Sequence, residues 1–186
     1  ADRFKFNTGY GMSAYDKGSI FLSQLQYIIG KENFDNTLKK YFNDWSFRHP
    51  KPNDFIRSAE KVSGLELDWY LLDWAQSTMT IDYSINSVYG VDNKTKIVLK
   101  RIGQMGMPID IKIILDSGNS LDFNIPMTKM RGSKPLENST LLESWSWAKP
   151  YYEFWIDVNS NKISKIEIDP KNEMADINRG NNSLDL

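Results

Sequence analysis

The sequence predicts an α+β fold in which an N-terminal α-helical array is followed by an antiparallel β-sandwich. Up to about residue 77, apolar residues recur at steps of three and four, which is the period of a helix with one buried face. After Thr78 apolar and polar residues alternate, which is the period of a strand. With 186 residues, 40% of them hydrophobic, the chain can bury a real core. We expect a helical domain over 1-78, a sandwich domain over 79-170 and a polar C-terminal tail over 171-186.

Four helices are expected in the first domain. The first has a continuous apolar stripe from Ser13, which can cap its start, to Ile29, and Gly30 ends it. A second follows at once. The third lies between the break at Pro50-Lys51-Pro52 and Gly64, with Asn53 or Asp54 as its cap, and the fourth ends near Gln76. Short connections between helices favour antiparallel neighbours, so these helices are expected to form a compact array.

Six or seven short strands are expected between Thr80 and Asp169. Turn sequences such as Asp116-Ser117-Gly118-Asn119 separate their alternating patterns. Antiparallel strands of this kind predict a β-sandwich. The last stretch, residues 179-183, is polar, and we expect it to pack against nothing.

Charge and composition exclude several classes of partner. Lys and Arg (23) nearly cancel Asp and Glu (24), so there is no strong field to attract nucleic acid. No apolar run approaches the length of a membrane span, and residues 1-6 lack the apolar segment of a signal peptide. We expect a soluble chain with no nucleic-acid partner and no membrane segment, although the compartment does not follow from the sequence. Because the chain lacks an initiating Met, we expect a processed product or a piece of something longer.

Two motifs with possible chemistry are rejected. The segment Gly9-Tyr10-Gly11-Met12-Ser13-Ala14 matches the loose form of the dinucleotide fingerprint, but no buried parallel strand precedes it. His49 is the single histidine, and cysteine is absent, so zinc would need carboxylates around one loop imidazole. We therefore expect no bound metal in this chain.

Aromatic residues offer an alternative function. Five of them gather in the second half of the chain and predict either core filling or a platform for a sugar or peptide. They are Trp145, Trp147, Tyr151, Tyr152 and Trp155. In the second case the chain is a non-catalytic binding module for glycan or protein.

The chain is organised around the stretch from Gly11 to Gly18. Its motif Ala14-Tyr15-Asp16-Lys17-Gly18 is followed, in order, by Ile29-Gly30-Lys31-Glu32-Asn33-Phe34, Tyr41-Phe42, Asp54-Phe55 and Gly64-Leu65-Glu66-Leu67-Asp68-Trp69. This series resembles the aminopeptidase N family of zinc metallopeptidases (gluzincins). The resemblance covers residues 1 to about 77 and implies the part of the catalytic domain that follows the metal site. The strands fit the β-sandwich domain that follows in this family.

The resemblance implies a catalytic role for Tyr15. In the family the tyrosine of the Tyr-x-Lys-Gly signature donates a hydrogen bond to the oxyanion of the tetrahedral intermediate, as zinc-bound water attacks the scissile carbonyl. A tyrosine hydroxyl suits this role because its reference pKa of about 10 keeps it protonated at neutral pH. Tyr10, in the loop just before, is expected to line a substrate pocket. Lys17 and Gly18 are expected to be a solvated cation and a close helix-packing point. By periodicity alone Tyr15 lies on the apolar stripe, so burial in the core is the alternative.

The departures from the family pattern are as informative as the match. The family's His-Glu-x-x-His, its further zinc-binding Glu and its Gly-x-Met-Glu-Asn segment are all absent. In family order they would precede Ala1. We therefore expect a C-terminal fragment that has no cofactor and is inactive alone. Its full-length parent would hold zinc and act on peptide substrates, and its partner would be the missing N-terminal part of the catalytic domain.

Overall fold

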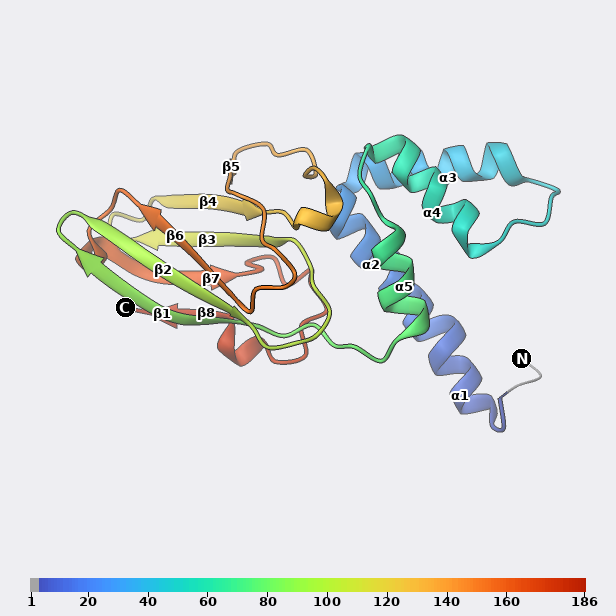
Figure 1. Cartoon of the computed structure of the whole chain (residues 1–186), viewed down its shortest axis with the longest axis horizontal. Helices are drawn as coiled ribbons and strands as arrows, with labels where there is room; N and C mark the ends of the chain where they lie inside the picture. Colours follow the sequence, from blue (N-terminus) through green and yellow to red (C-terminus); the bar gives the residue numbers. More distant parts are fainter. Residues whose placement is uncertain (1–3) are drawn as a thin grey trace.

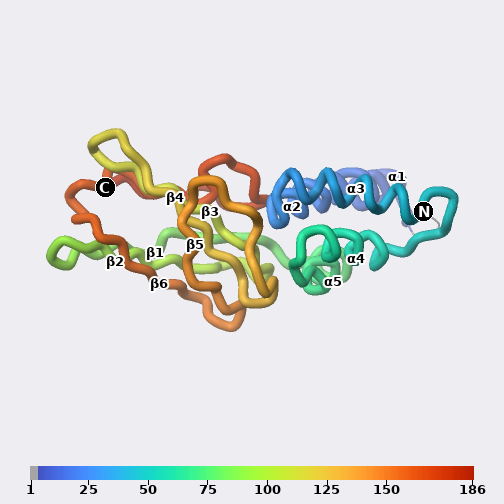
Figure 2. Tube along the Cα trace, turned by 90° about the horizontal axis from the view of Figure 1, so that it is seen from above, coloured from blue at the N-terminus to red at the C-terminus, as the bar shows by residue number. Residues whose placement is uncertain are grey.

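The computed structural model describes residues 4-186 and has the predicted α+β fold. Helices occupy one end of an elongated molecule and strands the other (Figure 1). The view from above shows the same division, with the C-terminal end of α2 next to the sheets (Figure 2). One cluster of buried residues runs through both ends and includes Ile28, Tyr70, Ile109 and Met174.

The first helix is longer than predicted. It runs without a break through α1 (Asn7–Gly11), a π-helical turn η1 (Met12–Asp16) and α2 (Lys17–Ile29), because the backbone at both junctions keeps right-handed helical angles. The predicted N-terminal cap at Ser13 is therefore wrong, since Ser13 lies inside the helix. The glycines that suggest a loop, Gly9 and Gly11, are helical as well.

The α-helices that follow are α3 (Lys31–Trp45), α4 (Pro52–Ser63) and α5 (Asp68–Gln76). Gly30 and Gly64 end their helices with φ angles of 84° and 72°, as predicted. The prediction that Asn53 or Asp54 occupies the cap position is wrong, because α4 begins at Pro52. Asp54 still satisfies the start of α4, since its carboxylate accepts a hydrogen bond from the Lys51 N–H at 2.8 Å.

Between Tyr83 and Asp185, eight strands form two sheets. The first sheet has the order β1-β2-β6 and the second the order β5-β4-β3-β7-β8. Neighbours are antiparallel except for β4 and β5. The sheets share the core, where the rings of Phe123 on β4 and Phe154 on β6 lie 5.7 Å apart. The strands are β1 (Tyr83–Val91), β2 (Lys94–Arg101), β3 (Ile109–Leu115), β4 (Ser120–Ile125), β5 (Thr140–Leu141), β6 (Tyr151–Ile156), β7 (Ile163–Ile168) and β8 (Ser183–Asp185).

The C-terminal residues pack against the molecule, which corrects the prediction of a free polar tail. Strand β8 pairs with β7, and Met174 is fully buried. The carboxylate of Asp169 accepts hydrogen bonds from the N–H groups of Glu173 and Met174 at 2.9 and 2.8 Å. The polar composition hides this folding, because a three-residue edge strand and one buried Met give no periodic signal.

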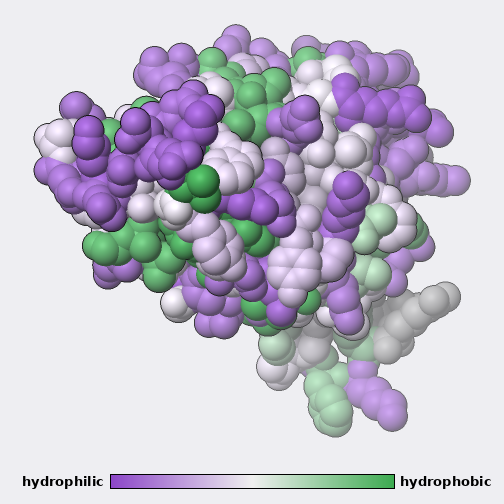
Figure 3. Space-filling model, turned by 60° about the vertical axis from the view of Figure 1, so that its left-hand side comes forward, coloured by the Kyte–Doolittle hydropathy of each residue, from purple (hydrophilic) through white to green (hydrophobic). Residues whose placement is uncertain are grey.

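The surface gives little information about function beyond what the sequence indicates. On the face shown in Figure 3, hydrophobic residues are spread among hydrophilic ones. Within residues 4-186, none of the helices combines the length and hydropathy that crossing a membrane would require.

Candidate functional site

Tyr15 lies in the π-helical turn η1, which the sequence pattern does not reveal. The Lys17 N–H donates to the carbonyl of Met12, five residues back, instead of four as in an α-helix. Such turns are frequently found at functional sites because they displace one side chain from the regular helix surface. The Tyr15 side chain is 67% exposed.

The π-helical turn brings together the two predicted site residues. Tyr10 and Tyr15 are five residues apart and would not be neighbours on a regular α-helix, where contacts join residues three or four apart. Here their rings meet edge to face, with centroids 5.8 Å apart and planes at 87°. The ring of Phe4 also meets that of Tyr10 edge to face, with centroids 5.8 Å apart. Tyr10 is thus on α1 and not in a loop, which corrects its predicted setting, but it does lie beside Tyr15.

The exposure of Tyr15 argues against the core alternative. By periodicity Tyr15 belongs to the apolar stripe that ends at Ile29. This stripe is buried in its second half, at Leu25 and Ile29, whereas Leu22 is 39% exposed. The added residue of the π-helical turn also puts Tyr15 out of phase with that stripe. Tyr15 is therefore a surface side chain of this chain.

The predictions for the two residues after Asp16 have different outcomes. Lys17 is exposed, as expected of a solvated cation, and its ammonium donates to the Ser77 carbonyl at 3.4 Å, which joins α2 to the end of α5. Gly18 is not a close packing point, because a Cβ built there would meet no atom within 4 Å. The prediction for Gly18 is therefore wrong.

Gly18→Ala is expected to stabilise the chain by about 0.5 to 1 kcal/mol, because alanine loses less backbone entropy in a helix and has free space here. Denaturant unfolding of the two proteins measures the difference. The matched control is Gly64→Ala, which also has free space but sits at a φ of 72° and should destabilise. A destabilising Gly18→Ala would show that this position is packed.

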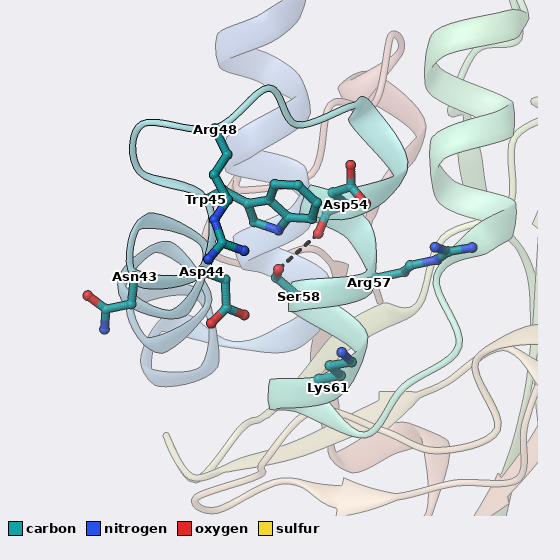
Figure 4. Close-up of a pocket in the computed structure, with 8 residues that line it drawn as sticks. All are labelled: Asn43, Asp44, Trp45, Arg48, Asp54, Arg57, Ser58 and Lys61. Carbon is teal, nitrogen blue, oxygen red and sulfur yellow. Dashed lines mark hydrogen bonds between the residues drawn. The ribbon is translucent and has the colours of Figure 1, made fainter.

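A depression with a volume of about 430 Å³ lies between α3 and α4, away from the tyrosine pair (Figure 4). Its carboxylates already have structural partners. Asp44 pairs with Lys40 at 2.8 Å, and this hydrogen bond lowers the pKa of Asp44. Asp54 serves the start of α4, and Arg57 points away from Trp45 (Figure 4). These contacts lie within α3 and at the start of α4, and they do not converge on a ligand.

No ligand set for zinc is found in the part of the chain that the structure describes. Among residues 4-186, no three His, Cys, Asp or Glu side chains lie close enough together to hold a metal ion. His49 is exposed in the connection between α3 and α4. The residues present do not fit the zinc centre that the family resemblance implies for the parent.

The five aromatic residues do not form one platform. Trp145 is buried and packs on Tyr152, with ring centroids 5.3 Å apart, so both belong to the core side. Tyr151 and Trp155 are about half exposed on β6. Trp147 is 56% exposed in a separate depression of about 350 Å³, where the Lys129 ammonium lies 4.9 Å from its ring centroid.

The helical end, which carries the half-buried Tyr10 and the exposed Tyr15, matches a known protein family. Residues 2-74 match the Peptidase family M1 domain, so the chain contains a segment of a peptidase domain. This match over residues 2-74 confirms the family resemblance seen in the sequence. The match ends near the last helix, before the strands begin.

A solved structure extends the comparison to the strands. The chain is similar to aminopeptidase A from Legionella pneumophila, solved in complex with aspartic acid, with a TM-score of 0.55 and 18% sequence identity. The alignment covers 86% of this chain, so the fold is shared across helices and sheets. This chain spans only 17% of the length of that enzyme. A search of curated proteins finds no match.

Proposed function

We propose that this chain is the C-terminal portion of a zinc-dependent aminopeptidase, whose full-length parent hydrolyses N-terminal residues from peptides. In this proposal Tyr15 stabilises the tetrahedral oxyanion, and the two sheets form the β-sandwich domain that follows the catalytic domain. The supporting observation is the exposed Tyr15 on a π-helical turn, inside the segment that matches the peptidase family.

The chemistry of Tyr15 fits this role. Within residues 4-186 its hydroxyl makes no hydrogen bond, so it is available to donate to a bound substrate. A neutral donor aimed at a developing negative charge lowers the barrier without becoming charged. The edge-to-face contact with Tyr10 restricts the ring, and a fixed donor has less to reorganise during the reaction.

The rest of the site would come from the N-terminal part of the catalytic domain. Large apolar side chains on the helical end are exposed, among them Phe6 (75%), Met12 (61%) and Phe42 (68%). Exposed apolar surface of this kind marks a contact region. We infer that the missing part of the catalytic domain covers it and carries the zinc ligands, so that the present chain alone is inactive.

An activity assay of the full-length parent tests the proposal. The parent should release N-terminal residues from peptides, lose this activity on chelation and regain it on addition of zinc. The 186-residue chain, assayed in parallel, should show none of it. A parent sequence without His-Glu-x-x-His before Ala1, or hydrolysis that survives chelation, would refute the aminopeptidase proposal.

A binding module remains the second candidate, and the exposed Trp147 favours it. The depression around Trp147 has two carboxylates and two cations beside an indole face, from Glu66, Asp68, Lys129 and Arg131. This balance suits a neutral polyhydroxylated ligand better than an ion.

Glycan-array binding tests the second candidate. Trp147→Ala should abolish the signal, whereas Trp155→Ala, which removes an indole of similar exposure on β6, should leave it unchanged. Absence of any glycan signal from the native chain, or equal losses in both variants, would exclude this candidate.

A further inference from the structure

A buried glutamine joins the helix of Tyr15 to the C-terminal segment that packs on the sheets. Gln24 on α2 is only 2% exposed. Its side-chain amide donates to the carbonyl of Glu173 at 2.8 Å and accepts from the N–H of Ala175 at 2.9 Å. Both ends of the amide are therefore used, by two backbone groups that lie far away in the sequence. A paired contact of this kind fixes direction as well as distance.

Tyr27 makes a second polar contact from the same side of α2. Residues three apart on a helix are neighbours, so Gln24 and Tyr27 face the sheets together. The Tyr27 hydroxyl accepts from the Asp110 N–H on β3 at 3.1 Å. The Lys134 ammonium lies 4.4 Å from the Tyr27 ring centroid and pairs with the Asp110 carboxylate at 2.5 Å. Burial, followed by the nearby Asp110 and Asp169 carboxylates, raises the pKa of Tyr27 well above its ordinary value, so the hydroxyl stays neutral.

The N-terminal half of the same helix is held by α5. The Tyr70 hydroxyl donates to the Phe21 carbonyl at 2.5 Å, and the Lys17 ammonium contacts the Ser77 carbonyl. Helix α2 continues without a break into the π-helical turn that carries Tyr15. Its position is thus set at two places along its length, by α5 and by the segments that pack with the sheets (Figure 2).

We propose that Gln24 is a positioning residue for Tyr15, through which the two-sheet part of the chain sets the axial position and rotation of the catalytic helix. The inference rests on the proposed function, because a positioning role for Gln24 requires that Tyr15 takes part in the reaction. A helix rotates by about 100° and advances about 1.5 Å for each residue of slip, so a contact that forbids slip also fixes where Tyr15 points. Misplacement of a catalytic group by about 1 Å can lower a rate about a hundredfold.

A double-mutant cycle in the full-length parent tests the inference. Gln24→Leu keeps a similar size but leaves the Glu173 carbonyl and the Ala175 N–H unpaired. We expect it to lower kcat about tenfold with little change in KM when Tyr15 is present, and to have almost no further effect in a Tyr15→Phe background. Gln24→Glu, which keeps the acceptor and loses the donor, should give a smaller loss and covers the case in which Gln24→Leu fails to fold.

The control is Thr37→Val, which removes a buried hydroxyl that donates within α3 to the Asn33 carbonyl at 2.7 Å. It should not change kcat. Equal losses from Gln24→Leu with and without Tyr15, or a comparable loss from Thr37→Val, would overturn the positioning role. If Tyr15→Phe alone leaves turnover unchanged, the proposed function itself fails. If Tyr15→Phe lowers turnover but Gln24→Leu has the same effect with and without Tyr15, only the positioning role of Gln24 fails.

Discussion

Replacing Tyr15 by phenylalanine in the full-length parent is expected to lower kcat by about 10² to 10³-fold, with a much smaller effect on KM. The hydroxyl would donate to the oxyanion only as negative charge develops, and loss of one such donor has an effect of this size. An interaction made mainly in the transition state appears in kcat and not in substrate binding. Steady-state kinetics on a peptide substrate measure both constants.

The structure separates this effect from a loss of folding. Tyr15 is 67% exposed, and phenylalanine retains the ring that packs against Tyr10. The stability of the Tyr15→Phe chain should therefore stay within about 0.5 kcal/mol of the native value. Tyr10→Phe is the matched control, because it removes the neighbouring hydroxyl and keeps the same ring contact. Equal falls in kcat for the two variants, or unchanged turnover for Tyr15→Phe, would remove Tyr15 from the mechanism.

Helices and strands that follow from hydrophobic periodicity can be predicted from the sequence, whereas features that depend on local backbone geometry cannot. Stripes such as the one ending at Ile29, and alternations such as Ile109 to Ile113, report burial directly, so most helices and strands were placed correctly. The π-helical turn leaves no such pattern, because one extra residue shifts the phase only locally. Gly9 and Gly11 also read as a loop, although glycine is permitted in a helix and lies in one here.

The candidate site likewise has features that the sequence indicates and features that only the structure shows. The family motif singles out Tyr15, whereas periodicity favours its burial, and the three-dimensional structure shows an exposed ring beside Tyr10. The contact of Gln24 with Glu173 and Ala175 had no signal at all in the sequence. A polar residue near the apolar stripe of a helix is ordinarily assigned to solvent, and its partners lie in a segment that composition marks as a tail.

The segment between α5 and β1 provides the second large expected effect. Residues Thr80 to Asp82 connect the helices to the first sheet, and the turn after β2 packs directly on them. The Gly103 N–H donates to the Asp82 carbonyl at 2.9 Å, and the Met105 N–H donates to the Thr80 carbonyl at 3.1 Å. A Cβ on residue 103 would lie 2.3 Å from the Thr80 carbonyl oxygen and 2.5 Å from the Asp82 nitrogen. Both are backbone atoms, which cannot rotate away as a side chain can.

Gly103→Ala is therefore expected to destabilise the chain by about 3 kcal/mol, at the upper end of the usual overpacking cost, because the turn and the connecting segment must separate. Denaturant unfolding measures the change, and amide hydrogen exchange should quicken at Ile102, Gly103 and Met105, whose N–H groups donate to this segment. Gly18→Ala makes the same chemical change with no neighbour within 4 Å, so the opposite sign there isolates the clash from the general effect of adding a methyl group. A Gly103→Ala protein as stable as the native chain would mean that the connection between helices and sheets yields easily, and a rigid link from the sheets to the helix of Tyr15 would then lose its structural basis.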